Sequence, residues 1–298
     1  MNRRTFVQLA AGATLAQPLL ADALRAAADA TGARFSVMLW TLKKQFPFER
    51  CVEIAAEAGY NGVQLVGEFQ KWTAEETQRT VSRIHSLGLV VDSMSGVRAG
   101  FSTASDTDIF ISQLKEQLEA AKRLACPQVI LLSGKRVPEL SPAAQTQTSV
   151  ENLKRAADLA ATDGIEIVIE PIDALENSTI FLQTVTDAFE IVRQVASPNV
   201  KVLYDFYHEQ RGFGNLIEKL SNYIDQVGLV HIADVPGRHE PGTGEINYAT
   251  IYRKLADLRY DRFIAMEFYP TGNAVGSLKS ARIEAVQAIR GGHPSTPA

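Results

Sequence analysis

Short apolar runs alternate with longer amphipathic runs along most of the chain. The apolar runs are near-continuous and bounded by glycine or polar residues, which is typical of strands buried on both faces. They lie at 35–40, 62–67, 89–96, 128–134, 165–172, 200–208, 227–234 and 262–270. Each is followed by a run with helical periodicity, at 48–59, 73–88, 106–125, 141–164, 184–196, 215–225, 248–260 and 277–291. The pattern therefore predicts eight strand–helix pairs.

Strict alternation of strand and helix over residues 33–290 indicates an α/β fold with a parallel sheet. Eight pairs are the number that closes a (β/α)8 TIM barrel, and no linker or shift in composition divides the region, so we expect a single domain. An open, doubly wound sheet is the alternative, but no Gly-x-Gly-x-x-Gly motif opens any helical run. Thr73 and Glu76 have the spacing of a capping box, which supports a helix beginning there.

The two ends of the chain do not follow this pattern. Residues 1–32 carry Arg3 and Arg4 before a weakly hydrophobic, alanine-rich run, which predicts a twin-arginine signal peptide and a tether. A periplasmic or exported location follows from that interpretation, and an ordinary amphipathic helix is the alternative. Residues 291–298 are predicted to be a frayed tail. No apolar run reaches the roughly 18 residues that span a bilayer, so no stable membrane insertion is expected.

Composition narrows the class of partner. Hydrophobic residues make up 46% of the chain and charged residues 21%, which indicates a globular protein rather than a disordered one. The formal net charge of −4 argues against nucleic acid as a partner, because phosphate binding requires a basic face. Cys51 and Cys126 fall at opposite ends of the predicted barrel, so we expect two buried thiols rather than a disulfide.

Four ionisable residues end four consecutive predicted strands. They are Glu170, Asp205, His231 and Glu267. Because the carboxyl ends of barrel strands meet at one mouth, these side chains should point to one place. Three buried carboxylates would repel one another, and a divalent cation removes that cost. Carboxylates with one imidazole suit Mn²⁺ or Mg²⁺, with Co²⁺ also compatible, whereas local pairing of each acid with Lys or Arg is the alternative.

Further polar residues flank this predicted metal site and are candidates for binding a substrate. His208 follows Asp205 by one helical turn and should look into the mouth of the barrel, and Arg238 lies in the loop that follows His231. A guanidinium there suits a carboxylate or hydroxyl group. Glu176 and Trp40 are expected to reach the same pocket, the latter as an apolar wall. The alternative for His208 and Arg238 is that they are solvent-facing loop residues, and the alternative for Trp40 is plain packing at the top of the barrel.

This constellation predicts proton-transfer chemistry on a small hydroxy-carbonyl compound. A metal that holds two adjacent oxygens of the substrate acidifies the C–H bond between them. Two carboxylates on opposite sides, Glu170 and Glu267, can then remove and return a proton through an enediolate. The outcome is aldose–ketose isomerisation, or epimerisation when the proton returns to the other face. No redox cofactor is required.

Several segments resemble the hydroxypyruvate isomerases, a group within the xylose isomerase-like TIM barrels of the sugar isomerase and epimerase superfamily. The resemblance covers most of 34–275 and is strongest at 46–64, 120–134, 167–173, 198–210 and the unusual loop 231–248. It implies a divalent metal, an enediolate mechanism and interconversion of hydroxypyruvate with tartronate semialdehyde. It also implies that the metal ligands and the acid/base pair are Glu170, Asp205, His231 and Glu267. Barrels of this kind often pair, so a homodimer is compatible with the sequence.

Three positions depart from the pattern of that group. Hydroxypyruvate isomerases carry Gln where this chain has His231, while ketose 3-epimerases carry His, and Gln64 stands where relatives commonly have an acidic residue. The segment 68–76 also lacks the usual aromatic–proline loop. A ketose 3-epimerase, or a lyase or hydratase acting on an oxidised sugar, is therefore the main alternative. A glycoside hydrolase using two carboxylates, an abasic-site endonuclease and a sugar-binding module are weaker ones.

Overall fold

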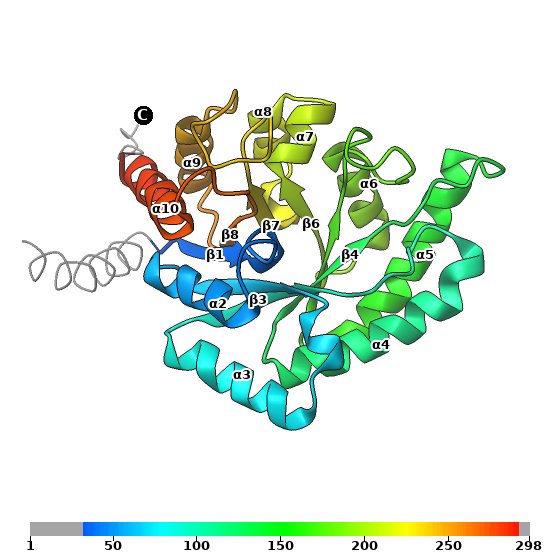
Figure 1. Ribbon diagram of the computed structural model, residues 1–298. Helices are drawn as coiled ribbons and strands as arrows, with labels where there is room; N and C mark the ends of the chain where they lie inside the picture. The colour runs from blue at the N-terminus through cyan, green and yellow to red at the C-terminus, as the bar shows by residue number, and fades with distance from the viewer. Residues whose placement is uncertain (1–31, 292–298) are drawn as a thin grey trace, which may run out of the picture.

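Eight parallel strands close on themselves in sequence order and are surrounded by helices (Figure 1). The computed structural model describes residues 32–291. The strands are β1 (Arg34–Met38), β2 (Gly62–Val66), β3 (Val90–Ser95), β4 (Gln128–Leu132), β5 (Glu166–Glu170), β6 (Val200–Asp205), β7 (Val227–Ile232) and β8 (Phe263–Met266). β1 pairs with β8 as well as with β2, which closes the barrel. The predicted α/β barrel is confirmed, and the open sheet is excluded.

Each strand is followed by at least one helical segment. The α-helices are α2 (Phe48–Glu57), α3 (Ala74–Ser86), α4 (Thr107–Arg123), α5 (Pro142–Ala161), α6 (Val185–Val195), α7 (Phe206–Gly212), α8 (Leu216–Asn222), α9 (Tyr248–Asp257) and α10 (Ala274–Gly291). Short 3₁₀ helices are η1 (Leu39–Thr41), η2 (Glu68–Lys71), η3 (Ala104–Asp106) and η4 (Ile224–Gln226). The capping box predicted at Thr73 and Glu76 is present at the start of α3.

All eight strands are shorter than their predicted apolar runs, and at β6 and β1 the run continues directly into a helical turn. The run 200–208 ends as a strand at Asp205, because the Asp205 carboxylate accepts a hydrogen bond from the Tyr207 amide (2.8 Å) and caps α7. The run 35–40 ends as a strand at Met38, and the following residues form η1. In both cases an apolar sequence continues into a buried helical turn, which hydropathy alone cannot separate from a strand.

The barrel interior explains where the polar site begins. One hydrophobic layer lies between the strands and the helices, and a second, smaller cluster fills the barrel. The inner cluster consists of Met38, Ile130, Val168, Leu203, Leu229 and Ala265. Because side chains alternate along a strand, residues two positions further on point the same way. On β5 to β8 those positions are occupied by the four residues predicted to bind a metal.

Other predictions about the chain concern its two cysteines, membrane insertion and the two ends. Cys51 and Cys126 are both buried free thiols, as expected. No helix within residues 32–291 is long and apolar enough to cross a membrane. The predicted export signal lies in residues 1–31, and most of the predicted tail in 292–298, so both fall outside the described residues.

Candidate metal centre

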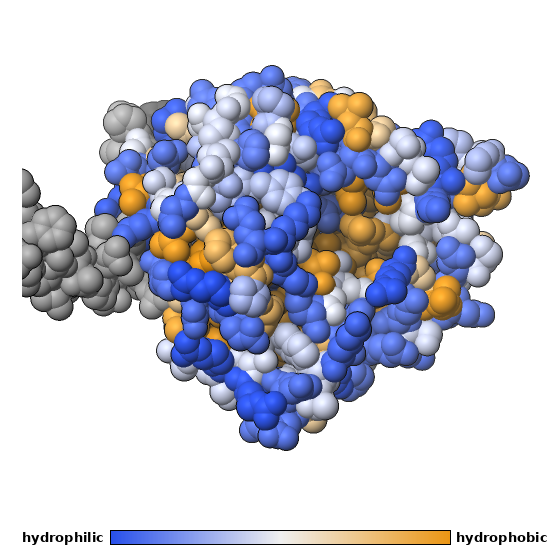
Figure 2. Space-filling model, in the orientation of Figure 1, coloured by the Kyte–Doolittle hydropathy of each residue, from blue (hydrophilic) through white to orange (hydrophobic). Residues whose placement is uncertain are grey.

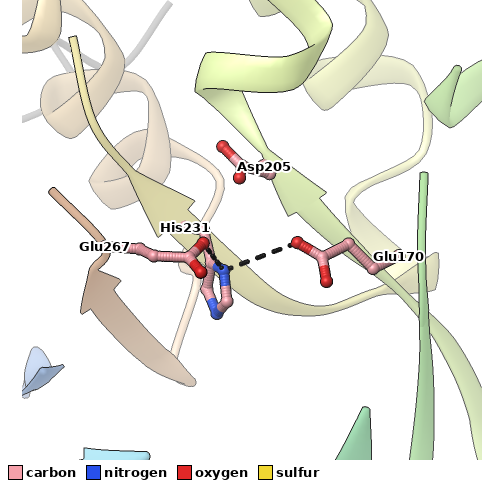
Figure 3. Close-up of side chains that lie close together, drawn as sticks. All are labelled: Glu170, Asp205, His231 and Glu267. Atoms are coloured by element: carbon pink, nitrogen blue, oxygen red, sulfur yellow. Dashed lines mark hydrogen bonds and ion pairs between the residues drawn. The ribbon is translucent and has the colours of Figure 1, made fainter. Parts of the chain in front are cut away.

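The four strand-end residues converge at the mouth of the barrel (Figure 3). Glu170 and Asp205 are the last residues of β5 and β6, His231 is the next to last of β7, and Glu267 directly follows β8. One ligand atom from each lies within 4.8 Å of those of the others. The structure thus brings together the residues that the sequence placed at one point.

The donor set fits a divalent cation. All four residues are buried, with Glu170 the most accessible at 9%. Two ligands on opposite sides of one ion lie about 4–5 Å apart when metal–oxygen distances are about 2.0–2.6 Å, and the observed 4.8 Å limit agrees with this. Three carboxylates and one imidazole favour a hard or borderline ion over a thiophilic one.

His231 presents one particular nitrogen to this centre. Its Nδ1 lies 2.6 Å from Glu267 Oε2 and 3.8 Å from Glu170 Oε1, whereas its Nε2 lies 2.9 Å from Gln64 Oε1. The Gln64 amide nitrogen donates to Asp92 Oδ2 (2.8 Å), so the amide oxygen faces the imidazole. A carbonyl oxygen accepts only, and Nε2 therefore carries a hydrogen. The lone pair available to a metal is on Nδ1.

Asp92 anchors this arrangement from below, although the sequence did not single it out. It is buried in β3, and its Oδ2 also accepts a hydrogen bond from Ser36 Oγ (2.9 Å). Burial raises the pKa of the Asp92 carboxyl group to about 7. An acid in the middle of a predicted strand was the available signal. It was missed because barrel chemistry is expected at the ends of strands and not along them.

The two glutamates have opposite electrostatic environments. Burial, followed by repulsion from Glu267, raises the pKa of Glu170. Burial alone would also raise the pKa of Glu267, but the Arg238 guanidinium and His231 hold it well below its usual range. Burial opposes the protonation of His231, yet Glu267 raises its pKa to about 9. A pair of carboxyl groups whose pKa values are pushed apart is the arrangement found in acid/base sites.

Arg238 is buried beside the centre although it lies in a loop. Its Nη2 is 2.7 Å from Glu267 Oε2 and 3.2 Å from Asp205 Oδ2, and its guanidinium lies 4.8 Å from the centroid of the Tyr207 ring. The loop is held by the Asp234 carboxylate, which accepts hydrogen bonds from four backbone amides of residues 235–246. This internal scaffold fixes Arg238 before any substrate arrives.

His208 is also buried, on the first turn of α7. Its Nδ1 is 2.7 Å from Asp173 Oδ2, and its Nε2 faces Asp205 Oδ2 at 3.5 Å and Arg238 Nη1 at 3.4 Å. Burial would lower the pKa of His208, but Asp205 and Asp173 raise it. Asp173 was not predicted. The signal in the sequence was an acidic residue only three positions after Glu170, in the loop that follows β5.

The remaining two predicted substrate residues differ in position. Trp40 is not merely an apolar wall, because its Nε1 donates a hydrogen bond to Glu267 Oε1 (2.6 Å). Its ring packs edge-on against Tyr269 at 5.4 Å. Glu176 lies at the rim, with 42% of its side chain exposed; Arg211 pairs with it at 2.9 Å, while Arg238 is 3.8 Å away. Glu176 thus borders the centre rather than entering it.

Comparisons with known proteins agree with the fold. A family model described as the xylose isomerase-like TIM barrel matches residues 52–288. The 2-oxo-tetronate isomerase of Pectobacterium atrosepticum is 29% identical over 82% of this chain and 95% of its own length. The hydroxypyruvate isomerase of Escherichia coli is 28% identical over 83% and 97%. The solved structure of an AP endonuclease, family 2, from Brucella melitensis superposes with a TM-score of 0.76 at 27% identity, covering 83% of this chain and 96% of that one.

Proposed function

The chain belongs to the xylose isomerase-like TIM-barrel family, and from this premise we propose that it is a divalent-metal-dependent isomerase of a small hydroxy-carbonyl acid. The observation that carries the proposal is the buried convergence of Glu170, Asp205, His231 and Glu267. The relatives named hydroxypyruvate isomerase and 2-oxo-tetronate isomerase support these two compounds as the first substrates to try. Mn²⁺ and Mg²⁺ are the first metals to try, with Co²⁺ next.

The proposed reaction moves protons only. A bound metal would hold adjacent oxygens of the substrate and make the intervening C–H bond more acidic. Glu267, which Arg238 and His231 keep ionised, removes the proton from the hydroxyl-bearing carbon. Glu170, whose pKa is raised, returns a proton to the neighbouring carbon of the enediolate. The hydroxyl proton passes to the former carbonyl oxygen, so substrate and product have the same mass.

Arg238 and His208 would orient the substrate. Arg238 lies against both Glu267 and Asp205, so its guanidinium is placed to bind an oxygen of a molecule at the centre. The Asp173 carboxylate fixes Nδ1 of His208 as a donor, which leaves Nε2 facing the centre. Trp40 restrains Glu267 through its indole N–H group. Together these contacts hold the side chains in place before a substrate binds, which lowers the entropic cost of reaching a reactive geometry.

Epimerisation is the second candidate because it uses the same two carboxylates. Glu170 ends β5 and Glu267 directly follows β8, with His231 between them, so they can address the two faces of one carbon. If Glu170 returned the proton to the carbon from which Glu267 removed it, the configuration would invert and no carbonyl would move. A ketose 3-epimerase and an isomerase thus differ in the product and not in the site.

Nucleic-acid cleavage is disfavoured, although the Brucella relative bears the name of an endonuclease. A net charge of −4 does not suit a phosphate backbone. Export of the enzyme, inferred from Arg3 and Arg4, is a separate proposal. Fractionation of cells that express the full chain would test it, with recovery in the periplasmic fraction expected and retention in the cytoplasm contradicting it.

Product analysis tests the proposed function. Metal-loaded protein is incubated with hydroxypyruvate and with 2-oxo-tetronate, and products are identified by mass spectrometry and NMR. We expect new compounds of unchanged mass, with activity lost after chelation by EDTA and restored by Mn²⁺ or Mg²⁺. Loss of water from the substrate would indicate a hydratase or lyase instead. Activity that persists in EDTA would exclude a metal-dependent mechanism.

A further inference from the structure

The mouth of the barrel has two unlike halves. The metal centre takes its side chains from β5 to β8. The other half, at the carboxyl ends of β2, β3 and β4 and along the loop after β5, is a groove of about 440 Å³. Its lining includes Val66, Ser95, Arg98, Leu132, Lys135 and Ile180. The space-filling view shows a hollow with hydrophobic side chains on this side of the molecule (Figure 2).

The groove adjoins the metal centre through the sheet itself. Leu132 on β4 is the register partner of Glu170 on β5. Neighbouring strands lie about 4.8 Å apart, and register partners point to the same side of a sheet, so both side chains project into the mouth. Asn177, which also lines the groove, belongs to the same loop as Asp173. A substrate that reacts beside Glu170 and is too long for the metal centre would therefore extend along this groove.

The walls suit a hydroxylated carbon chain. Val66, Leu132 and Ile180 supply apolar surface, while Ser95 and Asn177 add hydrogen-bonding groups. The volume lies within the range of roughly 300–1,000 Å³ that is usual for sites binding ligands of drug size. A three-carbon acid such as hydroxypyruvate would leave most of this space to water.

The charged residues of the groove are all cations. Arg98 and Lys135 line it, and no acidic residue does. In the described part of the chain, neither side chain takes part in an ion pair or a hydrogen bond, and both are exposed. Two unpaired cations beside this cavity favour an anionic ligand. A free guanidinium and a free ammonium group suit a carboxylate or a phosphate equally well in charge.

The backbone beneath these cations is fixed although their side chains are free. The amides of Arg98 and Ala99 donate to Gln113 Oε1 at 2.8 and 2.9 Å. The Lys135 carbonyl oxygen accepts a hydrogen bond from Gln145 Nε2 (3.1 Å). The two loops are therefore anchored to α4 and α5, and little ordering of the backbone is needed when a ligand binds.

We propose that the groove binds the distal end of the substrate and that this end is anionic. The natural substrate is then a sugar acid or a sugar phosphate longer than hydroxypyruvate. Its hydroxy-carbonyl end lies at the metal centre, and its carboxylate or phosphate group lies on Arg98 and Lys135. The reaction is the proton transfer described above, so this inference rests on the proposed function.

A matched set of ketoses tests the proposal. Fructose, fructuronate and the terminal phosphate ester of fructose share one hydroxy-ketone end and differ only at the far end. Their binding to metal-loaded protein is measured by equilibrium dialysis, and their turnover by NMR, with hydroxypyruvate as the short reference. We expect at least one of the two anionic ketoses to bind about tenfold or more tightly than fructose, as a charge-assisted contact does. Preference for fructuronate identifies a sugar acid, and preference for the ester identifies a sugar phosphate.

Variants of the two cations test whether the groove causes the preference for anionic ketoses. Arg98→Met and Lys135→Met should each weaken binding of the preferred anion about tenfold, and raise its KM with little change in kcat, while fructose is unaffected. Arg136→Met is the matched control, because Arg136 is the exposed neighbour of Lys135 and does not line the groove. Equal binding of all three ketoses, or variants that leave the anion preference intact, would overturn the groove assignment. If no compound reacts but the preference and its loss are seen, the proposed function fails and the groove assignment stands.

Discussion

At the scale of single residues, the centre is organised by contacts from beneath it. His231 and Gln64 are two of the positions that depart from the hydroxypyruvate isomerase pattern, and they form a hydrogen bond with each other at 2.9 Å. Gln64 in turn donates to Asp92. The departures are thus one paired feature, in which an amide held by an acid selects the nitrogen that His231 offers to a metal. Because 167 positions separate the two residues, nothing local in the sequence indicates this pairing.

Glu267→Gln tests the acid/base assignment. The amide keeps the size of the side chain and can still accept from Trp40, but it cannot take a proton from carbon. We expect a folded protein with weaker metal binding and turnover reduced about 10²–10⁴-fold. Glu116→Gln, an exposed change on α4, serves as the control. Turnover of Glu267→Gln close to that of the wild type, with metal bound, would show that another group moves the proton.

Gln64→Leu tests the orientation of His231. The change removes the acceptor for the Nε2 hydrogen, so the imidazole is free to place its hydrogen on Nδ1 instead. We expect metal affinity to fall about 10–100-fold, as is usual when the outer partner of a metal-binding histidine is lost. Calorimetric Mg²⁺ titration and ¹⁵N chemical shifts of His231 in the Mg²⁺-loaded protein measure the two effects. Gln78→Leu, on the exposed face of α3, is the control; an unchanged tautomer and affinity would refute the orienting role.

Asp92→Asn tests the raised pKa of the buried carboxyl group through the pH dependence of stability. The pKa of Asp92 in the folded protein is about 7, above the value of roughly 3.9 for an unfolded aspartate. Between these values the folded state binds one more proton, so the stability that protonated Asp92 contributes is lost as pH rises through this window. Asparagine does not titrate, so the free energy of unfolding of the variant should rise relative to that of the wild type by about 2.5 kcal/mol between pH 5 and pH 8. Urea denaturation in EDTA measures this, with Asp158→Asn on α5 as control; a pH-independent difference would contradict it.

At the scale of elements, the strand ends position the chemistry. Apolar runs predicted all eight strands, and alternation placed Glu170, Asp205, His231 and Glu267 at one mouth, because burial on both faces leaves a clear pattern. The extent of β6 was not predictable, since Asp205 both ends the strand and caps α7. Asp173, the Nδ1 partner of His208, was missed because the contact joins a loop to a helix 35 positions away. Tertiary contacts of that kind have no local periodicity.

Gly100→Ala tests how closely the loops after β3 and β4 approach each other. A Cβ atom at Gly100 would lie 2.3 Å from Gly134 Cα and from the Ser133 carbonyl oxygen, which are both backbone atoms. We expect a loss of about 1–3 kcal/mol or more in the free energy of unfolding, because the backbone must shift. Gly276→Ala on α10 meets only side-chain atoms at 3.7 Å or more and is the control. Equal stability of the two variants would contradict the close approach.

At the scale of the whole molecule, the two proposed functions, proton transfer and binding of the distal end of the substrate, fall to different halves of the barrel mouth. The strand ends of β5 to β8 supply the candidate metal centre, and those of β2 to β4 supply the groove with the cations Arg98 and Lys135. The helices and the apolar interior beneath the mouth hold both halves in register. Metal binding should therefore stabilise the whole barrel, because the ligands come from four strands that close it.

Thermal unfolding with and without Mn²⁺ measures this coupling. A free metal concentration about 100 times Kd stabilises the folded state by about 2.7 kcal/mol, which raises Tm by roughly 5–10 °C for a domain of this size. Asp205→Asn is the matched variant, because asparagine can still accept the hydrogen bond that caps α7 but binds a cation poorly. Its Tm should respond weakly to Mn²⁺. An equal shift in both proteins would mean that the ion binds elsewhere.

Solvent deuterium exchange tests the central claim most directly. Hydroxypyruvate and 2-oxo-tetronate are incubated in D₂O with the metal-loaded protein, and the signal of the carbon-bound proton is followed by NMR. We predict exchange of this proton in the presence of Mn²⁺ or Mg²⁺, no exchange in EDTA, and loss of exchange in Glu267→Gln. Exchange that is independent of metal, or equally fast in Glu267→Gln, would contradict a metal-dependent proton transfer centred on Glu170 and Glu267.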